Sequence, residues 1–67
     1  MAERKMLREI MSLNDIYTYA ESISEMLREM YGGYDADVFD EVMVDEAFAR
    51  RLAARGYEVR PWQPEPA

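Results

Sequence analysis

The chain has 67 residues, a formal net charge of −6, no cysteine and no histidine. These values favour a single domain and exclude disulfide bonds, thiolate chemistry and imidazole as a proton carrier or metal ligand. The excess of acid also argues against direct binding to nucleic acid or to an anionic membrane, because both interactions depend on clustered Lys and Arg.

The sequence contains no targeting or membrane-spanning pattern. No stretch approaches the roughly 18 apolar residues of a membrane span, and residues 1–11 alternate charged and apolar side chains where a signal peptide would have an apolar centre. We therefore expect a cytoplasmic protein whose partner is another protein with a basic surface. A domain this small buries only about 60% of its unfolded surface, so self-association into a homodimer is also expected.

The first expected element is a short helix over residues 2–11, which carries one apolar stripe. A longer helix over residues 13–31 is indicated by apolar side chains that recur at spacings of three and four. Ser12 is its expected N-cap, and the Gly32-Gly33 pair is its expected end. Because neither Pro nor Gly separates the two segments, one continuous helix is the alternative.

Residues 34–54 have a helical pattern again, with Asp35 or Asp37 as the N-cap. An unbroken helix would place its two apolar groups on different sides, so we expect a break near Asp45. That aspartate then caps a last helix over residues 46–55, which is rich in Ala and Arg.

Gly56 is the expected end of the last helix, and residues 57–60 alternate as a short strand would. Residues 61–67 contain three prolines and are predicted to be a flexible tail beyond a single helical domain over residues 1–60. The predicted fold is therefore all-α, or mainly helical: a three- or four-helix mini-bundle with a short extended C-terminal arm or strand.

Acidic side chains concentrate in residues 14–46, which hold ten acids and one base. The acids are Asp15, Glu21, Glu25, Glu29, Asp35, Asp37, Asp40, Glu41, Asp45 and Glu46. One interpretation is a solvated face that keeps the protein soluble. The other is a partner-binding surface, in which Glu21, Glu25 and Glu29, about 6 Å apart along a helix, imitate the phosphates of a nucleic acid.

The motifs that support chemistry are missing. The segment from Asp35 to Glu41 is similar to a calcium loop, but it lacks the third acid and the glycine at the sharp turn. The Asp40 and Glu41 carboxylates would need a cleft to act as an acid and base pair, which a chain this short hardly builds. There is also no Gly-rich phosphate loop and no Ser–His pair. The sequence therefore predicts no enzyme, no metal and no cofactor.

Four apolar residues are candidates for contacts outside the monomer. Tyr19 and Met26 lie at the edge of the apolar face of the 13–31 helix, Tyr34 follows the two glycines, and Trp62 lies in the tail. Methionine and aromatic side chains favour adaptable contact surfaces.

The function we expect is a small acidic, non-catalytic protein-interaction module that self-associates. One alternative is an acidic inhibitor that mimics nucleic acid and blocks a nucleic-acid-binding protein, as phage anti-restriction and anti-CRISPR proteins do. Another is an antitoxin-like partner whose tail from Tyr57 onward folds on a toxin.

Overall fold

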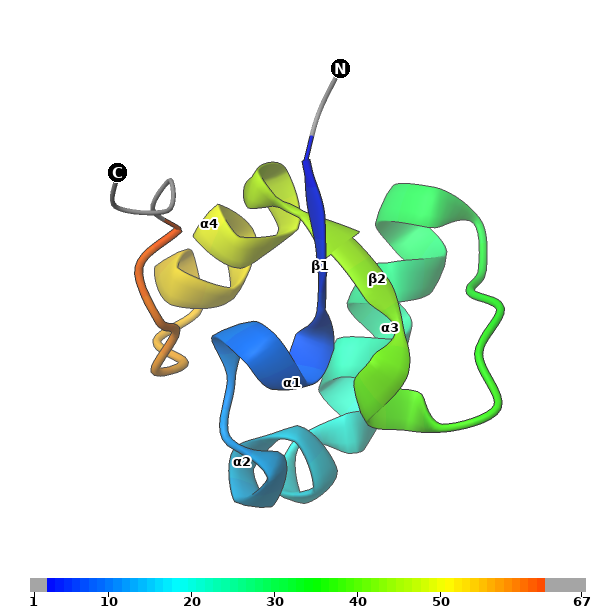
Figure 1. The fold of residues 1–67 in the computed structure, drawn as a ribbon, viewed down its shortest axis with the longest axis horizontal. Helices are drawn as coiled ribbons and strands as arrows, with labels where there is room; N and C mark the ends of the chain where they lie inside the picture. Colours follow the sequence, from blue (N-terminus) through cyan, green and yellow to red (C-terminus); the bar gives the residue numbers. More distant parts are fainter. Residues whose placement is uncertain (1–2, 63–67) are drawn as a thin grey trace.

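The computed structural model describes residues 3–62 and shows a mainly helical chain with one small sheet (Figure 1). The elements along the chain are β1 (Arg4–Met6), α1 (Leu7–Ile10), α2 (Leu13–Thr18), α3 (Ala20–Tyr31), the 3-10 helix η1 (Phe39–Glu41), β2 (Met43–Asp45) and α4 (Glu46–Ala54). Within the described range, every helix is too short or too polar to cross a bilayer.

The sheet pairs the beginning of the chain with a strand almost 40 residues later. β1 and β2 are antiparallel, with Lys5 opposite Val44, and Figure 1 shows them between α4 and α3. Val44 is fully buried and anchors β2 to the core. The Leu7 N–H donates to Val42 O at 2.8 Å and extends the pairing into α1.

The four α-helices and β2 contribute to one apolar core. Its buried members are Leu7, Ile10, Met11, Ile16, Ile23, Met26, Leu27, Val42, Val44, Phe48, Ala49 and Leu52. The Phe48 ring of α4 is fully buried and stacks against Tyr31 of α3, with 5.8 Å between ring centroids. Burial of these side chains is the main term that stabilises the fold.

Several predicted helix ends are confirmed. The Ser12 hydroxyl accepts the Asp15 N–H at 3.2 Å at the start of α2, and Asp45 accepts the Phe48 N–H at 3.0 Å at the start of α4. Gly32 ends α3 with a φ of 75°, in the left-handed region that a residue with a Cβ rarely adopts. Each signal is local, so the sequence alone is enough to place it.

The prediction of a helix over residues 2–11 is wrong in its first half, because residues 4–6 form β1. Only residues 7–10 are helical, and the pairing with β2 explains the difference. The mainly helical class is confirmed, but the sheet was not predicted. The helix predicted over residues 13–31 is also divided, by a turn at Tyr19 where the tyrosine ring packs on Tyr57 at 5.0 Å.

The helix predicted from residue 34 does not form there, and neither Asp35 nor Asp37 caps one. Residues 34–38 carry two aspartates and a valine, which favour non-helical backbone. Residues 43–45 form β2 where a helix was expected, because Val44 is buried and its strand pairs with β1.

Residues 57–62 form an extended arm without strand pairing. The Arg60 N–H donates to Ile10 O at 2.8 Å, and Tyr57, Val59 and Trp62 pack against the core. Within the tail predicted over residues 61–67, Pro61 and Trp62 are described, and residues 63–67 lie outside the described range.

Candidate protein-interaction surface

Four of the six exposed large apolar side chains in residues 3–62 lie on α2 and on the loop before η1. Leu13 and Tyr17, which are 54% and 52% exposed, are one helical turn apart on α2. Tyr34 and Val38 are exposed on the loop, next to the half-buried Phe39. We call these five residues the tyrosine face.

Phe39 lies between the two tyrosines of this face. Its ring centroid is 6.2 Å from that of Tyr17 and 5.7 Å from that of Tyr34, with tilted and edge-on geometries. Tyr34 is held further by a 3.2 Å hydrogen bond between its hydroxyl and that of Ser24 on α3. The rings are therefore positioned by α2, α3 and η1 together.

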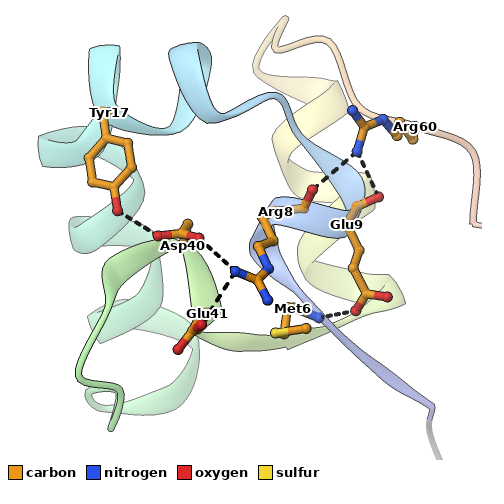
Figure 2. Close-up of polar contacts among 7 residues, drawn as sticks. All are labelled: Met6, Arg8, Glu9, Tyr17, Asp40, Glu41 and Arg60. Carbon is orange, nitrogen blue, oxygen red and sulfur yellow. Dashed lines mark hydrogen bonds and ion pairs between the residues drawn. The ribbon is translucent and has the colours of Figure 1, made fainter.

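A polar network fixes the inner side of the tyrosine face (Figure 2). The Tyr17 hydroxyl donates to Asp40 Oδ1 at 2.6 Å, and the Arg8 guanidinium lies 3.6 Å from Asp40 Oδ2 and 3.3 Å from Glu41 Oε2. The hydrogen bond to Asp40, followed by partial burial, raises the pKa of Tyr17 above 10.0. Asp40 is 6% exposed and connects α1, α2 and η1.

Half of the predicted acidic surface is engaged within the chain. The members with an ion-pair or hydrogen-bond partner are Glu29, Asp40, Glu41, Asp45 and Glu46. Glu46 pairs with Arg50 at 2.9 Å within α4, and Glu29 lies 3.9 Å from Arg55. Asp40, which is 6% exposed, is therefore not available at the surface, whereas Glu29 and Glu46 remain exposed.

Asp45 has a structural role that involves Tyr31. The Tyr31 hydroxyl donates to Asp45 Oδ1 at 2.7 Å and accepts the Asp45 N–H at 3.2 Å. Burial, and then this bond beside a carboxylate, raise the pKa of Tyr31 to about 12. Burial alone would raise the pKa of Asp45, but hydrogen bonds from Tyr31 and from the Phe48 N–H, with the nearby Arg4 charge, lower it below 3.8.

Four other acids, Glu21, Glu25, Asp35 and Asp37, are exposed, and none has a hydrogen-bond or ion-pair partner through its side chain in the described part of the chain. Asp35 and Asp37 lie in the same loop as Tyr34. Glu21 is three residues before Ser24, the contact of Tyr34, and therefore lies on the same side of α3 as Ser24. Asp15 is half-buried in the first turn of α2. Carboxylates thus border the tyrosine face.

The predicted apolar contact residues lie in different environments. Met26 is fully buried in the core, so its prediction as an outer contact is wrong. Tyr19 and Tyr34 are exposed, although each also packs on another ring. Trp62 is half-buried with the Lys5 ammonium 5.3 Å from its ring centroid.

Sequence reasoning missed Leu13 and Tyr17 as surface residues, because a straight helix over residues 13–31 would place both on its inner side. The turn at Tyr19 divides this segment into α2 and α3, so its residues do not share one straight helix. Within residues 3–62, no three acidic side chains gather as a metal site would require. Comparison of the chain with models of protein families, with curated proteins and with solved structures found no match.

Proposed function

We propose that the protein is a non-catalytic interaction module that binds a basic segment of another protein through the tyrosine face. The observation that carries this proposal is the cluster formed by Tyr17, Phe39 and Tyr34, which is exposed on one side and bordered by the free carboxylates of Asp35 and Asp37. In this proposal the helices form a three- or four-helix mini-bundle that serves as the scaffold for the face.

The chemistry of the surface favours a basic partner. Aromatic side chains are enriched where proteins bind one another and supply much of the binding energy. A lysine or arginine of the partner would gain from the tyrosine rings and from the neighbouring carboxylates at once. The net charge of −6 would speed the approach of such a partner at low salt.

Two other functions have less support. A nucleic-acid mimic needs a regular array of free charges, but Glu29 faces Arg55 and Asp40 is buried. An antitoxin-like tail needs residues from Tyr57 onward to be free for a toxin, whereas the arm packs on its own chain as far as Trp62. Self-association through the tyrosine face would place like charges against each other, so a second copy is a weaker occupant than a basic segment.

The proposal can be tested by selecting random displayed peptides on the wild-type protein. We expect the recovered peptides to combine Arg or Lys with a bulky apolar side chain. Leu13→Ser with Val38→Ser should weaken their binding at least about tenfold, because exposed apolar contacts are lost. The matched control, Ala47→Ser with Ala53→Ser on the exposed side of α4, should bind as the wild type does.

Higher salt should weaken binding in parallel, because it screens the carboxylates. Recovery of neutral or acidic peptides whose affinity is unchanged by Leu13→Ser with Val38→Ser would overturn the proposal. Concentration-dependent dimers in sedimentation, abolished by the same pair of changes, would show that a second copy occupies the face.

A further inference from the structure

The alternation of hydrogen bonds in the sheet determines which strand residues face outward. Lys5 and Val44 are directly opposite, and the Leu7 N–H reaches Val42 O. In an antiparallel pair the inward and outward backbone groups alternate, so the N–H and C=O of the residues on either side of Lys5 and Val44 point away from the sheet. These residues are Arg4 and Met6 on β1 and Met43 and Asp45 on β2.

Two of these outward positions are blocked by the chain itself. The Met6 N–H donates to Glu9 Oε2 at 2.7 Å, and the Asp45 N–H donates to the Tyr31 hydroxyl at 3.2 Å. Each bond satisfies a strand N–H that would otherwise be open to another strand. Met43 has no such bond among the described residues, and its side chain is 46% exposed. The edge of β2 is therefore open at one residue.

Met43 lines a pocket of about 610 Å³ between β2 and the loop that follows α3. This volume lies within the range of small-ligand pockets. The pocket walls include the backbone of Gly32 and Gly33 and the side chains of Tyr31 and Tyr34. The chain thus offers an outward backbone pair beside aromatic surface.

Opposite charges line the same pocket. The Arg4 guanidinium lies 5.3 Å from the Tyr31 ring centroid and has no carboxylate within 4 Å in the described residues. Asp35 is exposed at the loop and likewise has no ion-pair partner there. A ligand that satisfies both residues carries an acidic group and a basic group.

We propose that this pocket binds a short extended peptide by strand addition at Met43, with an acidic side chain of the peptide on Arg4 and a basic one on Asp35. Strand addition uses main-chain hydrogen bonds for affinity and side-chain contacts for specificity. Only one residue of β2 is open, so the contact is short and selective. The pocket shares Tyr34 and Asp35 with the tyrosine face and its border, but the open Met43 backbone and the Arg4 guanidinium belong to the pocket alone.

The test begins with a variant in which the tyrosine face is disabled, Leu13→Ser with Val38→Ser. Random peptides are selected on this variant, and the recovered sequence is synthesised and titrated against the wild-type protein. We expect peptides with one acidic and one basic side chain. Arg4→Gln and Asp35→Asn should each weaken binding about tenfold, the loss typical of a charged contact. The control Arg50→Gln, on the exposed side of α4, should leave the affinity unchanged.

Methylation of the peptide amides tests the strand geometry separately. Met43 can exchange main-chain hydrogen bonds with only one residue of an added strand, so methylation of that one peptide amide should weaken binding at least about tenfold and methylation of the other amides should not. The Met43 amide should also exchange more slowly with solvent in the complex. The proposal would be overturned if no peptide is recovered, or if methylation weakens binding equally at all amides. It would also be overturned if a folded Arg4→Gln variant binds the peptide as tightly as the wild type does. Arg4 and Met43 are not part of the tyrosine face, so the Arg4→Gln affinity and the Met43 exchange rate separate failure of this proposal from failure of the proposed function.

Discussion

The Tyr17 hydroxyl donates a 2.6 Å hydrogen bond to Asp40, a carboxylate 23 residues later in the chain. Asp40 is the one buried charged side chain in residues 3–62. Its second oxygen faces Arg8, so α1, α2 and η1 meet at one carboxylate. The same contact holds Tyr17 in the tyrosine face, and the binding surface and the stability of the fold are therefore linked.

Removal of this carboxylate should destabilise the protein. Asp40→Ala leaves the Tyr17 hydroxyl without its acceptor and removes one of the two carboxylates beside the Arg8 guanidinium, and hydrogen bonds to charged groups contribute about 1.5–3 kcal/mol. We expect the free energy of unfolding in urea to fall by about this amount. The control is Asp37→Ala, an exposed acid in the loop before η1, which should change the free energy of unfolding by less than about 0.5 kcal/mol. Equal losses in the two variants would show that Asp40 does not connect the helices.

The ionisation of Tyr17 offers a second measure of the same bond. The hydrogen bond to Asp40 is the main cause that raises the pKa of Tyr17 above 10.0. In Asp40→Asn the negative charge disappears, so the pKa should move down toward the ordinary value. Titration of the Tyr17 ring signals by NMR in the wild type and in Asp40→Asn measures this change.

The raised pKa of Tyr31 predicts that the fold loses stability at alkaline pH. Its pKa is about 12 in the folded chain and 10.0 without the fold, so the folded state favours the protonated hydroxyl. This contribution is complete below pH 10 and is lost as the pH rises from 10 toward 12. We expect the urea midpoint of the wild type to fall over that window, and Tyr31→Phe to fall less. A parallel decline in both proteins would contradict this assignment.

The lowered pKa of Asp45 acts at the other end of the pH scale. The sign is opposite, because a depressed carboxyl pKa stabilises the fold above its unfolded value of 3.8 and stops doing so as the pH falls through the folded value. Asp45→Asn removes the charge while it keeps an oxygen that can accept the Phe48 N–H. The urea midpoint of this variant should therefore depend less on pH below about 4 than that of the wild type. An unchanged acid profile would show that another carboxyl governs acid unfolding.

The helix ends were predictable because their signals are local. Ser12 and Asp45 each accept an N–H three residues later, and Gly32 has the positive φ that its lack of a Cβ permits. The sheet was not predictable in this way. Residues 4–6 have charge and apolar spacing compatible with a helix, and only the distant Val44 strand selects the extended form.

In the candidate site, too, the local features were predictable from the sequence and the long-range contacts were not. Acid content and the aromatic residues are visible in the sequence, so an acidic surface within residues 15–46 and, separately, an apolar contact at Tyr34 were expected. The fold alone determines which acids are free, because Asp40 is drawn inward by Tyr17 and Arg8. It also exposes Leu13 and buries Met26, contrary to the pattern of one straight helix. Contacts between distant segments thus determine which side chains are exposed and which are buried, because the local sequence pattern does not specify this.

The C-terminal arm should contribute measurably to stability through Arg60. Its N–H bonds to Ile10 O, and its guanidinium donates to Arg8 O at 3.1 Å and to Glu9 O at 3.2 Å, which caps the end of α1 (Figure 2). A chain that ends after Val59 should unfold at lower urea than one that ends after Trp62. The expected difference is at least about 2 kcal/mol, from three hydrogen bonds of about 0.5–1.5 kcal/mol each and the lost packing. Equal stability of the two truncated chains would mean that the arm only rests on the surface.

Glu9 should keep the edge of β1 closed. Its carboxylate accepts the Met6 N–H at 2.7 Å (Figure 2), so Glu9→Ala leaves that strand donor open and also removes a cap of α1. We expect the variant to lose about 1 kcal/mol of stability and to self-associate with rising concentration, because open strand edges pair with one another. Light scattering across a dilution series measures this, with Glu21→Ala as a control that removes the same charge from an exposed site on α3. Glu9→Gln retains an acceptor oxygen and should stay monomeric. Association in the Glu21 variant to the same extent would instead identify net charge, and not the strand edge, as the barrier to self-association.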